Sequence, residues 1–457
     1  MRTQVDLRTK VALARAARVA ARRLGRGGTT APGRVLLRLE PRAIERLGER
    51  LAEGAVLVSA TNGKTTTSGL LAGILRHAGR QVVHNRAGSN MHWGVATALL
   101  DAGRGTRELG LFEVDEGWLP AVSCALHPRA LVLSNLFRDQ LDRYGELEII
   151  ADRWASVVAD APPDTALVLC VDDPLIADLG RGRRRVVGFG IEDDSIALPG
   201  MQHAADSKHC RRCGHAYRYE VAYLAHLGRY RCPNCGRERP RPAVAAREVH
   251  LRGMRGTDLV VDTPAGELRA FLPLPGVYNV YNALGAAACA LELGASLDHV
   301  RAGLEGVTAV FGRTERVRLS GRDLAILLVK NPAGANEVLR TLLLEEERID
   351  LWIALNDGIA DGRDVSWVWD ADFELLAGRV RRVTCSGTRA EEMALRLKYA
   401  GVTAEAVVER DLGRSLDLAA ADGNGDGAPL YALPTYTALL ELRDILADRG
   451  AAGRWSE

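Results

Sequence analysis

The 457-residue sequence contains no run of about 18 apolar residues, which is the length that a membrane-spanning helix requires. Its first residues also lack the continuous apolar segment of a secretory signal. Neither sign of charge dominates, because 60 Lys and Arg residues face 58 Asp and Glu residues, for a formal net charge of +2. Attraction to a polyanion through overall charge is therefore excluded. Together these absences predict a cytoplasmic protein.

Cysteine is scarce outside two C-x-x-C pairs. Of the eight cysteines, four stand alone in largely apolar segments, which does not suit an oxidised disulfide framework. None of the four has the sequence context of a nucleophile elbow. The four isolated residues are Cys124, Cys170, Cys289 and Cys385.

Hydrophobic residues make up 47% of the chain, which is enough for two or three domains. From residue 51, short apolar runs alternate with helical patterns, as in α/β proteins with a parallel sheet. The sequence predicts an α/β fold in three parts. These are an N-terminal basic helix and lead-in (1–50), a central domain (51–312) with an insert at 203–240, and a C-terminal Rossmann-like α/β domain (313–457).

Residues 4–24 have the periodicity of a helix. Leu13, Ala17, Ala20 and Leu24 share one side, and Arg8, Arg15, Arg18 and Arg22 share the other. Over residues 1–34, nine Lys or Arg residues and one acid give a local net charge of +8. Two interpretations remain open: a docking helix with a solvated basic face, or a helix that contacts anionic lipid at the membrane.

The segment AVLVSATNGKTTTSG, residues 55–69, has the pattern of a strand, a phosphate-binding loop and a helix. In such a loop Lys64 holds the β- and γ-phosphate oxygens, and the Thr65 hydroxyl reaches Mg²⁺. The match to the full Walker pattern is incomplete, because Val58 and Ala60 stand where glycines occur in its long and short forms. A structural turn with an incidental lysine is the alternative. The predicted nucleotide-binding residues are Thr61, Asn62, Gly63, Lys64, Thr65 and Thr66.

Acidic and amide side chains follow the next two predicted strands, at the sheet edge where α/β proteins bind their ligands. One of these carboxylates, together with Thr65, could complete a Mg²⁺ shell with water. Surface acids at strand ends are also common without a metal. The candidates are Glu113, Asp115 and Glu116 after the first strand, and Asn135, Asp139 and Asp142 after the second.

The two C-x-x-C pairs, Cys210 with Cys213 and Cys232 with Cys235, are typical of a zinc ribbon. Four thiolates close the coordination sphere of Zn²⁺, so the predicted zinc is structural. Arginines near the pairs leave a nucleic-acid-binding ribbon as the alternative. Because the insert interrupts an ATPase domain, we expect a structural zinc and no nucleic acid partner.

Several motifs occur in an order that resembles the Mur ligases and folylpolyglutamate synthases. They are SATNGKTTT, EVDE, NLFRDQLDRYGE, VDDP, PGVYNVYNALGAAA and FGRTERV, over residues 51–320. Those enzymes activate a carboxylate with ATP as an acyl phosphate, which an amine then attacks. The ribbon and the segment LNDGIADGRDVSWVWDADFE, residues 355–374, resemble more narrowly the ligase subunits of lipid II isoglutaminyl synthases.

This resemblance implies roles for single residues. Asn279 or Asn282 would meet the adenine, and Arg313 would meet the ATP phosphates. Glu113 resembles the Mg²⁺-binding glutamate of the family, and Lys64 and Asp357 resemble its catalytic lysine and aspartate. Asp357 follows a strand-like run, but a loop-capping aspartate is an alternative there.

Two departures bear on the reaction. Gln140 stands where many Mur ligases have His, and KNPAG at residues 330–334 replaces the DYAH common in amino-acid-adding ligases. The resemblance then implies ammonia as the amine, a GatD-like class I glutamine amidotransferase subunit that supplies it, and the D-glutamate α-carboxylate of lipid II as acceptor. The alternatives are an amino-acid-adding or polyglutamate-forming ligase and a non-catalytic scaffold or nucleic-acid binder.

Overall fold

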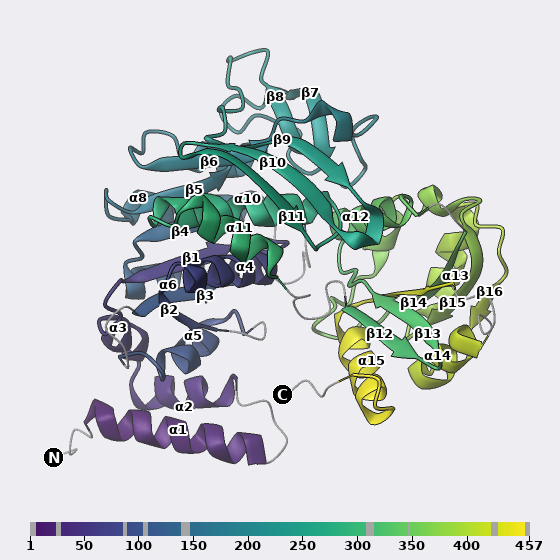
Figure 1. Cartoon of the computed structure of the whole chain (residues 1–457), viewed down its shortest axis with the longest axis horizontal. Helices are drawn as coiled ribbons and strands as arrows, with labels where there is room; N and C mark the ends of the chain where they lie inside the picture. Colours follow the sequence, from purple (N-terminus) through teal and green to yellow (C-terminus); the bar gives the residue numbers. More distant parts are fainter. Residues whose placement is uncertain are drawn as a thin grey trace.

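The computed structural model describes residues 6–23, 29–85, 89–103, 108–138, 147–307, 315–345, 348–421 and 428–452. Figure 1 shows two lobes side by side, each built on its own sheet, with two N-terminal helices packed at the outer end of the first lobe. The predicted boundary at 312/313 lies outside the described residues. The second sheet begins at Glu315.

The first lobe contains a nine-stranded sheet in the order β11-β10-β9-β6-β5-β4-β1-β3-β2. Strands β1 to β6 and β9 are parallel, as the βα rhythm predicts, and β10 and β11 extend the sheet as antiparallel strands. The strands are β1 (Ala55–Ser59), β2 (Gln81–His84), β3 (Glu108–Glu113), β4 (Ala130–Leu133), β5 (Ala166–Cys170), β6 (Val186–Ile191), β9 (Val244–Leu251), β10 (Thr257–Thr263) and β11 (Gly266–Leu272).

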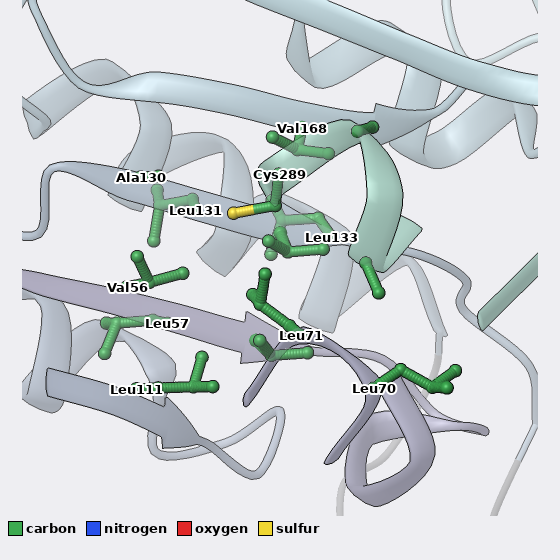
Figure 2. Close-up of a cluster of buried hydrophobic side chains, with 14 of the residues drawn as sticks. Val56, Leu57, Leu70, Leu71, Leu111, Ala130, Leu131, Leu133, Val168 and Cys289 are labelled. Atoms are coloured by element: carbon green, nitrogen blue, oxygen red, sulfur yellow. The ribbon is translucent and has the colours of Figure 1, made fainter. Parts of the chain in front are cut away.

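Helices cover the parallel strands of this sheet, which explains why β1, β3, β4 and β5 are buried along their whole length and mostly apolar. Figure 2 shows Val56 of β1, Leu131 of β4, Leu71 of α4 and Cys289 of α10 in one buried cluster. The helical elements are α4 (Lys64–His77), α5 (His92–Leu99), α6 (Leu119–Leu126), α8 (Leu147–Asp160), α9 (Pro174–Leu179), η1 (Asp194–Ile196), η2 (Gly253–Arg255), α10 (Val277–Glu292) and α11 (Leu297–Glu305).

The second lobe is a six-stranded sheet in the order β12-β13-β17-β14-β15-β16, parallel except for β12. Its strands are β12 (Glu315–Leu319), β13 (Arg322–Ile326), β14 (Ile349–Ala354), β15 (Val380–Ser386), β16 (Ala406–Val408) and β17 (Leu430–Pro434). Its helical elements are α12 (Pro332–Leu342), η3 (Ser366–Trp369), η4 (Phe373–Leu376), α13 (Ala390–Tyr399), α14 (Leu412–Ala421) and α15 (Tyr436–Asp448). Both lobes are therefore α/β, as predicted.

The N-terminal helices are α1 (Leu7–Arg23), α2 (Ala31–Leu39) and α3 (Ala43–Gly48). The predicted orientation of α1 is wrong. Arg15 donates to the Leu100 carbonyl and Arg18 forms an ion pair of 2.9 Å with Asp101, so these two arginines face the protein. Leu13, predicted on the packed side, is 51% exposed. The reason is a tertiary contact. The Leu100 carbonyl and the Asp101 carboxylate, directly after α5, accept hydrogen bonds from arginine, which leucine cannot donate.

The helices that the structure describes include none with the length and apolar character to cross a membrane.

Candidate active site and zinc site

The phosphate-binding loop lies between β1 and α4, as predicted. Gly63 adopts a φ of 89°, and a Cβ atom there would lie 1.9 Å from the Asn282 side-chain oxygen. Glycine is therefore required both by the backbone conformation and by the contact with α10. Helix α4 begins at Lys64, so its N-terminal N–H groups and its positive dipole end face the loop.

Asn135, which follows β4, holds this loop from the neighbouring strand. Its side-chain oxygen accepts from the Asn62 N–H at 2.9 Å, and its side-chain nitrogen donates to the Asn62 carbonyl at 3.0 Å. The Thr61 hydroxyl accepts from the Phe137 N–H at 3.1 Å. These contacts within the protein fix the loop.

Lys64 is buried at the mouth of the loop, where its ammonium forms an ion pair of 2.7 Å with Glu116. Burial lowers the pKa of Lys64, but the charges of Glu116 and Asp115 raise it by more, so the net shift is upward. The lysine is therefore a permanent cation, as a phosphate clamp must be.

Thr65 and Glu113 lie together at the same edge of the sheet. The Thr65 hydroxyl donates to a Glu113 carboxylate oxygen at 3.0 Å. Asn85 fixes the end of β3 through its side-chain oxygen, which accepts from the Glu113 N–H at 2.9 Å. A hydroxyl beside a carboxylate is an oxygen donor set that fits Mg²⁺. Asp139, Gln140 and Asp142 lie outside the described residues.

The two lobes meet over the loop. Asn62 and Asn331 exchange side-chain hydrogen bonds of 3.0 and 3.3 Å, and the Lys330 ammonium donates to the Thr61 carbonyl at 3.3 Å. A pocket lies between the lobes at this point. Residues on its loop side are Asn62, Gly63, Asn135 and Phe137. Those from the hairpin of the cysteine ribbon (218–231) and from α10 are Leu224, Leu227, Tyr278, Tyr281 and Asn282, and those from the second lobe are Leu327, Leu328, Lys330, Ala333, Gly334, Glu337 and Val338.

The two asparagines predicted to meet adenine lie one helical turn apart on α10. The Asn282 side chain donates to the Asn279 side chain at 3.0 Å, and the Asn279 side chain donates to the Pro275 carbonyl at 2.8 Å. Asn282 lines the interlobe pocket, whereas Asn279 is not among its lining residues. Arg313, the predicted phosphate contact, lies outside the described residues.

Asp357 follows β14 at the carboxyl end of the second sheet. Its carboxylate accepts from the Thr388 hydroxyl and from the Arg389 guanidinium, both at 2.8 Å. The Thr388 hydroxyl, and then Arg389, hold the pKa of Asp357 below its ordinary value. The carboxylate is 29% exposed and is not among the residues that line the interlobe pocket.

The four paired cysteines converge, as their spacing predicts. All four sulfur atoms lie within 4.8 Å of one another. The Sγ–Sγ distance is 3.6 Å between Cys210 and Cys235, and it is 3.5 Å between Cys213 and Cys232. The Asn234 side chain and the His215 backbone lower the pKa of Cys213 to about 6, which favours the thiolate that a metal binds. The donor set fits tetrahedral Zn²⁺.

The ribbon hairpin, β7 (Arg218–Leu224) and β8 (Leu227–Arg231), connects this cluster to the pocket. Leu224 and Leu227 at its tip line the pocket wall. At the other side of the ribbon, Arg239 forms a buried ion pair of 2.7 Å with Asp172, which follows β5. The ribbon therefore forms part of the pocket wall in addition to its cysteine cluster.

Three contributors were missed by sequence reasoning. Asn135 was considered only as a metal ligand, although it clamps the loop. The Asn331 contact joins segments 269 residues apart and leaves no local signal. Glu337 carries a charge in a helical pattern, which is typical of solvent-facing positions, yet it is 1% exposed.

A loop of this kind, with an acid next to its threonine and a second α/β domain closing over it, defines an ATP-dependent ligase of the Mur ligase type. In agreement, the Mur ligase middle domain matches residues 58–235 and the MurT ligase C-terminal domain matches residues 328–439. Membership in the Mur ligase family implies ATP and Mg²⁺.

The lipid II isoglutaminyl synthase (glutamine-hydrolyzing) subunit MurT of Staphylococcus aureus (strain N315) is 32% identical over 440 residues, covering 96% of this chain and 97% of that protein. The same subunit of Streptococcus pneumoniae (strain ATCC BAA-255 / R6) is 34% identical over 433 residues, covering 93% and 94%. The chain therefore belongs to the MurT family and is an ATP-dependent ligase.

Solved structures share the fold at low identity. A pseudomurein peptide ligase type C from Methanothermus fervidus has a TM-score of 0.67 at 22% identity, covering 87% of this chain and 79% of that one. Folylpolyglutamate synthase of Mycobacterium tuberculosis has a TM-score of 0.60 at 17% identity, covering 90% and 95%.

Proposed function

We propose that the chain amidates the α-carboxylate of D-glutamate in the lipid II stem peptide to D-isoglutamine, with ATP and with ammonia from a glutaminase partner. The names of the nearly full-length relatives support the substrate, and the loop with Lys64, Thr65 and Glu113 supports carboxylate activation. The observation that carries the proposal is the MurT-type second lobe closing over this loop through Asn331.

In the first step the substrate carboxylate oxygen attacks the γ-phosphorus of ATP, and ADP leaves. Lys64 and the N–H groups at the start of α4 would offset the charge on the transferred phosphoryl group. Thr65 and Glu113 would hold Mg²⁺, which when bound neutralises charge on the phosphate oxygens. The product is an acyl phosphate.

In the second step ammonia attacks the acyl carbon, and inorganic phosphate leaves with the former acid oxygen. The nitrogen must lose a proton to become the amide. Asp357, ionised and held by Thr388 and Arg389, is the residue we assign to accept a proton from ammonium or to orient ammonia. Further closure of the second lobe, beyond the present contact between Asn62 and Asn331, would bring it toward the loop.

The ammonia source is a separate subunit, a GatD-like glutamine amidotransferase. The named relatives are subunits of a glutamine-hydrolyzing synthase. Burial raises the pKa of both Cys289 and Cys385 to about 12, so neither supplies a thiolate nucleophile at neutral pH. The same effect raises the pKa of Cys170 well above its ordinary value.

We also propose that the chain meets this lipid-linked substrate at an anionic membrane surface through α1. The exposed face of α1 carries Leu13 and Val19, which are 51% and 52% exposed, and Arg8 borders it. An exposed apolar face in a basic helix is typical of interfacial helices.

The test is the product mass. The chain is incubated with lipid II, ATP and glutamine, with and without a GatD-like subunit, and with ammonium in place of glutamine. Replacement of one acid hydroxyl by an amino group, dependent on the partner or on ammonium, is the expected result. Addition of a glutamate residue would instead identify an amino-acid-adding ligase.

A further inference from the structure

Glu337 lies on α12, inside the wall of the interlobe pocket. Its side chain is 1% exposed, and within the described residues neither carboxylate oxygen accepts a hydrogen bond. Buried carboxylates are normally paired, because an unsatisfied buried acceptor is costly. Glu337 is therefore an unsatisfied hydrogen-bond acceptor that lines the pocket, and a ligand in the pocket could donate a hydrogen bond to it.

The neighbouring arginine does not satisfy it. The Arg340 guanidinium remains 3.7 Å from Glu337 and instead donates to two backbone carbonyls, those of Ile196 and of Tyr223, the latter at 2.7 Å. Burial raises the pKa of Glu337 to about 7, although Arg340 lowers it. A ligand that donates a hydrogen bond would remove most of this cost of burial.

The rest of the pocket has the chemistry of a site for a flat heteroaromatic ring. Phe137, Leu224, Leu227, Tyr278 and Val338 supply aromatic and apolar walls. At one end the pocket reaches Asn62 and Gly63 of the phosphate-binding loop. A nucleotide with its phosphates on the loop would extend its base along these walls.

Asn282 also lines this pocket, and the family resemblance links it to adenine. Its side chain, however, already forms hydrogen bonds within the protein. The Asn282 oxygen accepts from the Thr67 hydroxyl at 3.2 Å, and its nitrogen donates to Asn279. Asn282 is thus held in place by protein contacts, whereas the Glu337 carboxylate is an acceptor with spare capacity. An exocyclic amine is the feature of a base that such an acceptor recognises.

We propose that Glu337 accepts a hydrogen bond from the exocyclic N6 amine of the ATP adenine and so selects adenine over bases that lack this donor. The inference rests on the proposed ATP site and deepens it. A base without the amine leaves the buried carboxylate unsatisfied, and that cost is the source of the discrimination.

The experiment measures binding of ATP and of purine riboside triphosphate, which lacks only the 6-amino group, to the full chain in Mg²⁺ by calorimetry. The wild type should bind ATP about tenfold or more tightly than the analogue, as expected for loss of a hydrogen bond to a buried charged group. Glu337→Leu should bind both nucleotides with similar affinity. Glu337→Gln, whose amide oxygen accepts the same bond, should keep the preference for ATP.

Each other outcome is decisive. Equal binding of the two nucleotides by the wild type, or a preference for ATP that survives in Glu337→Leu, would overturn the role of Glu337 and leave the ATP site standing. Failure of the wild type to bind either triphosphate would overturn the ATP site itself and this inference with it. Thermal unfolding of both variants controls for folding, and Glu337→Gln is the variant closest to native shape.

Discussion

Thr65 and Glu113 are 48 residues apart in the chain, yet the hydroxyl of one donates to the carboxylate of the other at 3.0 Å. The contact joins the first turn of α4 to the end of β3. The two oxygens would hold Mg²⁺, which would offset the charge of the nucleotide phosphates. The end of β3 and the first turn of α4, and not the loop alone, therefore form the candidate site.

Removal of the Thr65 hydroxyl should weaken Mg²⁺ use. Thr65→Val keeps the shape and loses the oxygen, so the Mg²⁺ concentration for half-maximal ATP hydrolysis should rise about tenfold or more. Thr65→Ser keeps the oxygen and is the matched control. Equal Mg²⁺ titrations for Thr65→Val and wild type would contradict the assignment.

Loss of Lys64 should cost both activity and stability. Lys64→Met removes the phosphate clamp, and ATP hydrolysis should fall by about 100-fold or more. It also leaves Glu116 buried without its partner, which we expect to cost about 3 kcal/mol of unfolding free energy. The double variant Lys64→Met with Glu116→Gln should recover stability by denaturant unfolding but not activity. Recovery of hydrolysis in the double variant would remove Lys64 from the reaction.

The cysteine cluster should hold one zinc per chain by elemental analysis. Cys213→Ser is expected to lower the unfolding temperature, because a closed metal site contributes folding energy. Since Leu224 and Leu227 of the same ribbon line the pocket, the apparent KM for ATP should also rise. Cys124→Ser, at an exposed isolated cysteine on α6, is the control. A metal-free chain of unchanged stability would exclude a structural zinc.

The exposed face of α1 should bind anionic vesicles. Leu13→Asp with Val19→Asp places charge on the side that leaves the protein, so co-sedimentation with phosphatidylglycerol vesicles should fall. Leu395→Asp, at a leucine 47% exposed on α13 of the second lobe, is the control. Unchanged sedimentation of the double variant would contradict membrane binding by α1. The helix would then serve only to pack on the first lobe through Arg15 and Arg18.

The parts that local sequence determines were predicted well. Apolar runs that end in a small polar turn identified β1, β3, β4 and β5 and the phosphate-binding loop, since a buried parallel strand needs only its own residues to be apolar. β17 is central in the second sheet, but its sequence gives little sign of a strand. Its LYALP segment is short and follows the low-complexity stretch AAADGNGDGAP.

Features that depend on distant partners were not predictable in this way. The rotation of α1 depends on Asp101 and on the Leu100 carbonyl, which the helix pattern does not contain. The burial of Glu337 likewise depends on the second lobe meeting the ribbon and α10. The hydrophobic pattern of a helix shows only which of its residues are apolar. The rotation of α1 is instead set by ion pairing, and the burial of Glu337 is set by the contact between the domains.

Asp357 provides the test that separates amidation from other uses of the fold. Asp357→Asn keeps the size and turn chemistry of the residue, and the Thr388 hydroxyl can still donate to its side-chain oxygen. The variant loses the charge needed to accept a proton or to orient the nucleophile. It should bind ATP and its glutaminase partner but fail to convert lipid II with glutamine or with free ammonium, as measured by product mass.

The pH dependence sharpens this test. Because Thr388 and Arg389 hold the pKa of Asp357 below its ordinary value, the carboxylate stays ionised at neutral pH. Any stability it contributes is present above its unfolded pKa and is lost only as pH falls through the lower folded value. An acid limb of activity above about pH 5 must then belong to another group, since an ordinary Asp titrates near 4. Asp364→Asn, in the same loop, should behave as wild type. Rescue of Asp357→Asn by ammonium would assign Asp357 to ammonia delivery, and normal turnover with glutamine would remove it from the mechanism.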